Sequence, residues 1–322
     1  MRALALLVLL VSASATAQAP ERRTDAQWVT LGTGGGPVVQ LERGQPANAV
    51  VVGDAVYLFD AGEGTQARLK AAGLGIERVR AVFLSHHHLD HIGGVGPIIV
   101  NRWILKRPDP LPVIGPPGTR EMVAGLLAAA RPTERSPLLL DGAPVRPIAG
   151  TATATDLPAV LAEPREVFRD GNVRVLAAAV DHYHDAAGRT SRAAYSYAYR
   201  VEAGGRSFVY TGDTGPSEAL ERLAKGADVL VAEVMDRPAI AAALERMDLP
   251  PTAKAGFMRH MDLDHMTPPQ VGALARRAGV GRVVLTHLVP GRDEETDTAG
   301  YTAGLAKQFS GPVAVARDGD RF

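Results

Sequence analysis

The sequence predicts an α/β fold in which short buried strands alternate with helices. Apolar runs of four to eight residues, rich in β-branched and aromatic side chains, are typical of buried strands. Segments with helix start and stop signals lie between these runs. Of the 322 residues, 46% are hydrophobic, and no low-complexity block or linker divides the chain. These observations favour one large α/β unit over two separate domains.

The apolar runs define the predicted strands in chain order. The first two, Val50–Val52 and Val56–Asp60, predict a hairpin that turns at Gly53-Asp54. Five later runs are predicted as strands: Val79–Leu84, Val173–Val180, Ser207–Thr211, Asp228–Val231 and Arg282–Thr286. Most of them end at a residue of a type that binds metals. Open sheets build sites along one edge in this way.

Three helices are predicted from periodicity and capping signals. Thr119–Ala130 carries apolar side chains on one helical face, and Pro216–Lys225 precedes a glycine. Thr267 begins a capping box with proline at the first helical position, and Gly279 ends that helix. Residues 131–170 are rich in Pro, Thr and Arg, so we expect loops there, over the rim of the site.

The run His86-His87-His88-Leu89-Asp90-His91 is the strongest indication of chemistry. It holds four of the nine histidines of the chain and directly follows a predicted strand. His86 and His88 lie two positions apart and project to one side. Asp90 and His91 fall on the turn that opens the next helix. The pattern therefore predicts two imidazoles at one metal position, with a carboxylate and an imidazole offset towards a second.

Other predicted strands deliver further ligand types at their C-terminal ends. His182 and His184 both follow Val173–Val180, so either residue is a candidate. Asp213 follows the strand that ends at Thr211, and His287 follows Thr286 directly. Because all these residues must converge, a domain boundary between Asp90 and His287 would divide the site.

With this pattern the chain resembles the metallo-β-lactamase-fold hydrolases. The runs Leu31–Gly36 and Leu58–Thr65 resemble the opening motifs of their ribonuclease Z and arylsulfatase-like branch. The resemblance implies a four-layer αββα sandwich and two divalent metal ions. Zinc is expected, with iron and manganese as alternatives. Two features differ from ribonuclease Z: Ala232 replaces the histidine before Glu233, and no long tRNA-binding arm is evident between Thr151 and Val180.

The resemblance also implies roles for individual residues. One metal would bind His86, His88 and His182, the other Asp90, His91 and His287, with Asp213 shared. His182 is favoured over His184 because it directly follows Asp181, as in related sequences. We predict that Asp90 and His265 take part in catalysis. His265 resembles a histidine that protonates the leaving group, although it could instead be a helix-entry residue. Asp60 could orient a ligand histidine, and Glu233 could hold His265.

The N-terminus predicts export. Met1-Arg2 precedes the apolar run Ala3–Val11 and an Ala-x-Ala ending, which together indicate a secretory signal peptide, residues 1–17. The apolar run is too short to span a bilayer, which needs about 20 residues. Cleavage after Ala17 would leave residues 18–322 as a single-domain periplasmic or secreted protein without stable membrane insertion.

Composition narrows the expected function. The chain has no cysteine, which excludes disulfides and thiolate ligands, and its formal net charge is zero. Neutral charge argues against nucleic acid as a partner. We therefore expect a hydrolase that uses a metal-bound hydroxide on a small anionic ester, with phosphodiesters favoured. The alternatives are an arylsulfatase-like enzyme, a carbonyl hydrolase (lactonase, thioesterase or β-lactamase) and a ribonuclease Z-like endoribonuclease. The oligomeric state stays open, and a homo-oligomer is compatible with the sequence.

Overall fold

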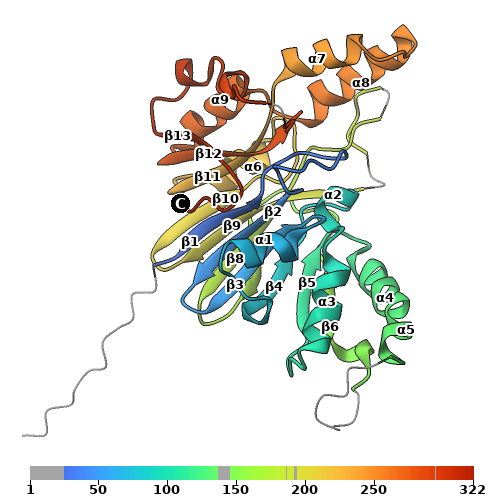
Figure 1. Cartoon of the computed structure of the whole chain (residues 1–322). Helices are drawn as coiled ribbons and strands as arrows, with labels where there is room; N and C mark the ends of the chain where they lie inside the picture. Colours follow the sequence, from blue (N-terminus) through green and yellow to red (C-terminus); the bar gives the residue numbers. More distant parts are fainter. Residues whose placement is uncertain (1–24, 137–145, 186, 192–193, 294) are drawn as a thin grey trace, which may run out of the picture.

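The structure is a computed structural model that describes residues 25–136, 146–185, 187–191, 194–293 and 295–322. Two mixed sheets stack face to face (Figure 1). The first sheet contains, in spatial order, β1 (Gln27–Gly32), β2 (Ala47–Val52), β3 (Ala55–Ala61), β4 (Val79–Phe83), β5 (Leu111–Gly115) and β6 (Ala152–Asp156). The second contains β13 (Val313–Val315), β12 (Arg282–Val289), β11 (Val229–Met235), β10 (Arg206–Tyr210), β9 (Ser196–Ala203), β8 (Val173–Val180) and β7 (Arg165–Arg169).

Each sheet is antiparallel in one half and parallel in the other. In the first sheet, β1, β2 and β3 pair antiparallel, and β3 to β6 pair parallel. In the second, β7 to β10 pair antiparallel, and β10 to β13 pair parallel. The parallel strands direct their C-terminal ends to a common edge, where loops can bring side chains together.

The space between the sheets is an aromatic core. Trp28 of the first sheet lies 6.0 Å from Phe208 and 5.9 Å from Tyr210 of the second, measured between ring centroids. Phe83 lies 5.7 Å from Tyr199 in the same way. Because these rings are fully buried, they fix the separation and orientation of the two sheets.

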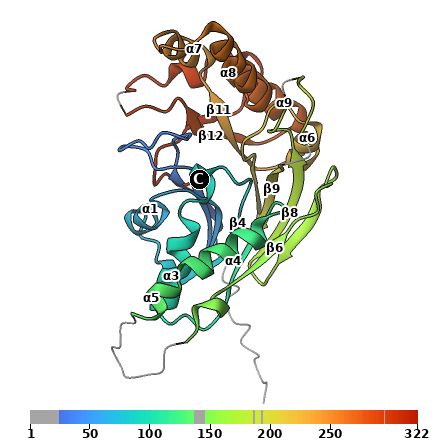
Figure 2. The ribbon, with the colours of Figure 1, turned by 90° about the vertical axis from the view of Figure 1, so that its right-hand side faces the viewer.

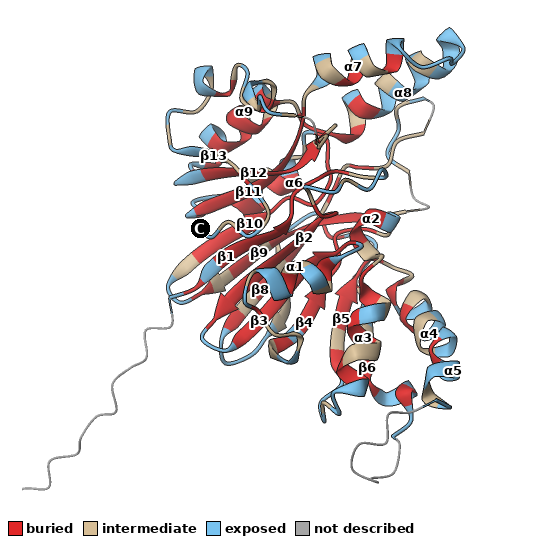
Figure 3. Ribbon diagram, in the orientation of Figure 1, coloured by how far each residue is buried: buried red, intermediate tan, exposed pale blue. Residues whose placement is uncertain are grey.

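Helices cover both outer faces. A second apolar cluster lies between the first sheet and α1 (Thr65–Ala71), α3 (Val95–Ile104) and α4 (Thr119–Ala129) (Figure 2). A third lies between the second sheet and α6 (Glu218–Ala224) and α9 (Pro268–Ala278). The central strands are almost wholly buried, while the helices are buried on one side (Figure 3). The order helix, sheet, sheet, helix confirms the predicted αββα sandwich.

Four further α-helices of the described residues are short or peripheral. They are α2 (Leu89–Ile92), α5 (Arg131–Glu134), α7 (Arg237–Glu245) and α8 (Pro251–Asp264). Helices α7 and α8 lie side by side beyond the second sheet (Figures 1 and 2). In the part of the chain that the structure describes, no helix is both long and apolar enough to cross a bilayer. The predicted signal peptide, residues 1–17, lies outside the described residues, and export stays a prediction.

The local sequence signals were largely accurate. The hairpin turns at Gly53-Asp54, and α9 begins with the predicted capping box at Thr267. It ends at Gly279, whose φ of 67° is readily adopted by glycine. The predicted helix Pro216–Lys225 is shorter at both ends in the structure. Ser217 is its extended N-cap, and Lys225 is its C-cap.

The prediction that residues 131–170 are loops is wrong in part. This segment contains α5, β6 and the edge strand β7, and residues 137–145 lie outside the described part. Both strands are short and half-exposed. Because they contain many Thr, Arg and Glu side chains, they lack the clear alternation of apolar and polar residues that predicts a strand. The connection between them, Ala159–Ala162, lines a cavity of about 790 Å³ together with Asp181 and Tyr183, and no predicted metal ligand is among the lining residues of that cavity.

Candidate metal centre

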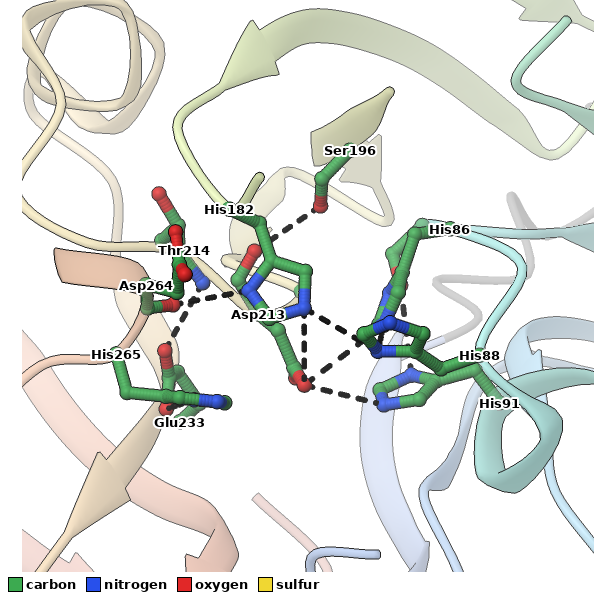
Figure 4. A network of polar contacts seen from close by, with 12 residues as sticks. His86, His88, His91, His182, Ser196, Asp213, Thr214, Glu233, Asp264 and His265 are labelled. Carbon is green, nitrogen blue, oxygen red and sulfur yellow. Dashed lines mark hydrogen bonds and ion pairs between the residues drawn. The ribbon is translucent and has the colours of Figure 1, made fainter. Parts of the chain in front are cut away.

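Residues far apart in the sequence meet where strands of both sheets end. His86 and His88 follow β4, His182 follows β8, and Asp213 follows β10. His287 lies within β12, where a register shift and a φ of 43° turn its side chain out of the regular strand pattern. Figure 4 shows His86, His88, His91 and His182 directed towards the carboxylate of Asp213.

The first group of potential ligands comprises His86, His88, His182 and Asp213. Nδ1 of His88 lies 2.9 Å from Nε2 of His86 and 3.3 Å from Nε2 of His182. The Asp213 Oδ2 atom lies 3.8 Å from Nε2 of His86 and 4.0 Å from that of His182. His88 is the exposed member, so the group opens to solvent on its side.

The second group comprises Asp90, His91 and His287, all buried. Oδ2 of Asp90 lies 3.5 Å from Nε2 of His91 and 3.8 Å from Nε2 of His287. Asp213 also borders this group, because its Oδ2 is 3.4 Å from His91 Nε2 and 3.1 Å from His287 Nε2. One carboxylate oxygen of Asp213 therefore faces both groups.

Several buried nitrogen and oxygen atoms of the two groups lack a hydrogen-bond partner, as expected for atoms that bind a metal. Among the described residues, Nε2 of His91, Oδ1 of Asp213 and both ring nitrogens of His287 are buried without a hydrogen-bond partner. Buried polar atoms are otherwise almost always paired. Several unpaired imidazole nitrogens next to two carboxylates form a donor set that suits zinc and related divalent ions. The Asp/His cluster therefore has the donor set of a metal site.

The electrostatics of the first group point the same way. Burial lowers the pKa of His86 well below its usual range and that of His182 to about 3. Burial alone would raise the pKa of Asp213, but His287 and His91 lower it well below the ordinary value. Metal ligands must be neutral imidazoles and ionised carboxylates, and these three residues meet that requirement.

The second group favours positive charge. Burial alone would raise the pKa of Asp90, yet His91 and His287 lower it to about 2. Burial alone would lower the pKa of His287, but the carboxylate of Asp213 raises it to about 10. The two carboxylates thus stabilise a cation in this half of the site.

Asp60 positions His91 of the second group through a hydrogen bond to its ring. Its carboxylate is fully buried at the end of β3 and accepts from His91 Nδ1 at 2.7 Å and from Tyr210 Oη at 2.8 Å. Ser85 donates its backbone N–H and its hydroxyl, both at 2.7 Å. With Nδ1 of His91 donating to Asp60, the lone pair of Nε2 points into the site.

Replacement of Asp60 by asparagine should weaken metal binding. The amide keeps the size of the carboxylate but loses the charge that orients His91, and its NH₂ group would face other donors. We expect metal affinity to fall about 10- to 100-fold, the usual range for residues that orient ligands. Competition with a chromophoric chelator measures this, with Asp54→Asn in the exposed hairpin turn as the control. Unchanged metal affinity in a folded Asp60→Asn protein would contradict the role of Asp60 in orienting His91.

The glycine-rich run before β2 packs against the site. The backbone N–H of Gly36 donates to Asp90 Oδ2 at 2.9 Å. A Cβ at Gly36 would lie 2.2 Å from the same oxygen, and one at Gly35 would lie 2.9 Å from the ring of His287. Only glycine allows this approach, which explains in physical terms the opening motif seen in the sequence.

The structure distinguishes the two histidines that follow β8. His182 joins the metal group, and its Nδ1 is 2.9 Å from the backbone carbonyl oxygen of Asp264. His184 is directed elsewhere, since its Nδ1 lies 2.5 Å from Oδ1 of Asp264. His87 likewise points away from the site, with Nε2 3.0 Å from Thr119 Oγ1.

These contacts give a paired prediction for His182 and His184. His182→Ala should lower the bound metal by about one equivalent, because it removes a ligand of one ion only. His184→Ala should retain the metal and change kinetic constants at most. Metal analysis of both proteins, purified in parallel without chelator, decides the question. Metal loss in the His184 variant alone would reassign the ligand.

His265 and Glu233 form a buried pair beside the metal ligands. Nδ1 of His265 lies 2.9 Å from Oε2 of Glu233, and Oε1 of Glu233 accepts from the backbone N–H of Thr214 at 2.9 Å. Burial alone would lower the pKa of His265, but Glu233 raises it. His265 can also be grouped with Asp213 and His287 as a potential ligand set. It is thus placed either to donate a proton or to bind a metal.

Sequence reasoning missed several residues that support the site. Ser85 and Tyr210 were not considered, although both contact Asp60. Ser85 lies next to the histidine motif, so its position was a usable signal. Tyr210 approaches from the other sheet, and nothing in its own sequence context indicates this contact. Asp264 was also missed, because its interest lies in three-dimensional contacts with His182 and His184.

Comparison with known proteins gives consistent results. The family model described as a beta-lactamase superfamily domain matches residues 56–288. The chain is similar to a protein named Ribonuclease Z from Mycolicibacterium paratuberculosis, with 34% identity over 90% of this chain and 95% of the relative. A second relative of the same name, from Mycobacterium bovis, is 32% identical over 89% of this chain and 94% of its own.

Among solved structures, human short-form tRNase Z superposes with a TM-score of 0.63 at 20% identity, covering 92% of this chain and 98% of that one. Zinc-bound PqqB from Methylobacterium extorquens superposes with a TM-score of 0.59 at 17% identity, covering 92% and 99%. At these identities the superpositions show the fold alone.

The relatives correct the expected partners. From the sequence we expect a small anionic ester and no nucleic acid, because the net charge is zero. Full-length relatives named Ribonuclease Z overturn that expectation, since their name denotes an enzyme that acts on RNA. The physical error lies in the use of net charge. A sum over 322 residues does not describe the local field at a metal site that can bind phosphate.

Proposed function

The chain belongs to the beta-lactamase superfamily of metallo-hydrolases, and on that premise we propose that it is a ribonuclease Z-like enzyme that cleaves phosphodiester bonds of RNA. One observation carries the proposal. The buried pair of His265 and Glu233 lies beside two ligand groups that share Asp213, in a chain 34% identical to an enzyme named for this activity. Zinc is the proposed metal, supported by the donor set of imidazoles and carboxylates.

The ligand residues would hold two ions in the arrangement that the sequence predicted. His86, His88 and His182 hold one, Asp90, His91 and His287 the other, and Asp213 faces both. When bound, two divalent ions supply Lewis-acid polarisation of a phosphoryl oxygen and lower the pKa of a bound water to about 7. Asp90 and Asp213 neutralise only half of the ionic charge, so the site retains a positive balance that attracts a phosphodiester.

His265 is the proposed proton donor. Its Nδ1 is hydrogen-bonded to Glu233. Nε2 is therefore the atom that can hold a proton towards the reacting groups. The leaving oxygen of a phosphodiester develops negative charge as its bond to phosphorus breaks, and a proton from His265 Nε2 would neutralise it. Glu233 positions the ring and stabilises its protonated form, although the histidine that precedes this glutamate in ribonuclease Z is Ala232 here.

A cleavage assay tests the proposed function. Purified protein, with its metal content measured, is incubated with end-labelled precursor tRNA, a DNA oligonucleotide and an aryl phosphodiester that reports on the metal centre. We expect endonucleolytic RNA products, and their loss in the Asp213→Ala protein. Turnover of the aryl diester with RNA left intact would overturn the assignment of RNA as substrate.

A further inference from the structure

Helix α8 carries a histidine–aspartate cluster at the border of the metal centre. The carboxylate of Asp264 is 1% exposed and lies 2.5 Å from His184 Nδ1 and 2.6 Å from His260 Nδ1. The backbone carbonyl of the same residue accepts from Nδ1 of the metal-site residue His182. Asp264 therefore joins the end of α8 to the segment after β8, next to the metal ligands (Figure 4).

His260 is partly exposed to solvent beside the proposed proton donor. Its side chain is 45% exposed, and its ring centroid lies 5.8 Å from that of His265. Nδ1 of His260 is hydrogen-bonded to the Asp264 carboxylate, so Nε2, on the opposite side of the ring, is the nitrogen that can contact a ligand.

An aromatic side chain lies one turn further along the same flank. Phe257 precedes His260 by three residues and Asp264 by seven, and residues at these spacings share a helix face. At 1.5 Å per residue, the Phe257 backbone is about 10 Å from Asp264 along the axis, within reach of a neighbouring nucleotide. Among the described residues, Phe257 is the one aromatic side chain in the set of exposed large hydrophobic residues.

We propose that this flank of α8 binds a nucleotide next to the scissile bond. The base stacks on Phe257, and the ribose 2′-hydroxyl forms a hydrogen bond with Nε2 of His260. The inference rests on the proposed function and specifies its substrate contacts. Aromatic side chains accept any base by stacking, and the 2′-hydroxyl is the group by which proteins distinguish RNA from DNA.

The position of α8 supports this role. Between Thr151 and Val180 the described residues form only β6, β7, β8 and their connections, without a projecting arm. Instead α7 and α8 project beyond the second sheet next to the site (Figures 1 and 2). The salt bridge of Arg237 with Asp262, at 2.5 Å, links α7 to α8.

Steady-state kinetics with two substrates test the Phe257 contact. One substrate is an RNA oligonucleotide that the wild-type protein cleaves, and the other is an aryl diester without nucleotides. Phe257→Ala should raise KM for RNA about tenfold, the scale of one stacked base, and the loss should exceed that on the diester at least about fivefold. Phe257→Tyr should restore the RNA value. Met247→Ala, an equally exposed change at the tip of the α7–α8 pair, is the control.

The His260 contact is tested by pairing a protein change with a substrate change. RNA with a single 2′-deoxy nucleotide beside the cleaved bond should react about five- to tenfold more slowly with the wild-type protein. With His260→Ala that same deoxy substitution should have no further effect, because the two changes remove one shared contact. Equal and additive losses would overturn the contact.

The outcomes separate this inference from the proposed function. Wild-type protein that turns over the diester but no RNA would refute the proposed function and the inference with it. Wild-type protein that cleaves RNA, with Phe257→Ala and His260→Ala variants that cleave it equally well, would refute the α8 proposal alone. Equal losses on RNA and on the diester would assign both residues a structural role and also refute it.

Discussion

Asp213→Ala should lose both bound metal ions and at least about 1,000-fold in kcat/KM. Its Oδ2 atom is the one carboxylate oxygen that faces both ligand groups, 3.1 Å from His287 Nε2 and 3.8 Å from His86 Nε2. Removal takes a ligand and a negative charge from each ion at once. The expected loss corresponds to the several kcal/mol that metal ions contribute to transition-state stabilisation.

Metal analysis and RNA cleavage on the same preparation check this result. His87→Ala is the control, because His87 belongs to the same motif but contacts Thr119 rather than the metal-site residues. We expect this control to retain its metal. An Asp213→Ala protein with two equivalents of metal and ordinary turnover would refute the shared-ligand arrangement.

His265→Ala should slow the reaction about 100- to 10,000-fold for substrates with poor leaving groups, the range for loss of a general acid. The effect should be much smaller for aryl diesters with good leaving groups, such as nitrophenolate, because these depart without a proton. Measured rates across a series of aryl diesters therefore give a steeper dependence on leaving-group pKa in the variant than in the wild-type protein.

Metal content separates the two roles open to His265. A proton donor can be removed without loss of metal, whereas a ligand cannot. Glu233→Gln keeps the shape of the pair but removes the charge that raises the pKa of His265, so it should show the same leaving-group dependence in weaker form. Loss of metal in the His265→Ala protein, with no change in leaving-group dependence, would make His265 a ligand instead.

The elements and ligands that were predictable from sequence share one property: their signals are local. The histidine motif, the capping box at Thr267 and the hairpin turn at Gly53-Asp54 each lie within a few consecutive residues. Convergence of His182, Asp213 and His287 followed from the rule that strand ends share an edge of the sheet.

Features that depend on contacts between elements were not predictable. Tyr210 contacts Asp60 across the interface between the two sheets, and the two residues are 150 positions apart in the sequence. Whether Glu233 holds His265 could not be decided from the sequence, and the 2.9 Å contact spans 32 positions. The strands β6 and β7 were missed because their exposed polar side chains match the composition of loops. The argument from net charge against a nucleic-acid partner was wrong because net charge averages over the whole surface.

The central claim is that the seven converging ligands form a two-metal centre that cleaves RNA, and a metal titration tests it most directly. Protein freed of metal with a chelator is titrated with zinc while cleavage of a labelled RNA is followed. We expect no RNA cleavage without metal, and a cleavage rate that rises with added zinc and saturates at about two equivalents. Full RNA cleavage by the metal-free protein, or no RNA cleavage with both equivalents bound, would contradict it.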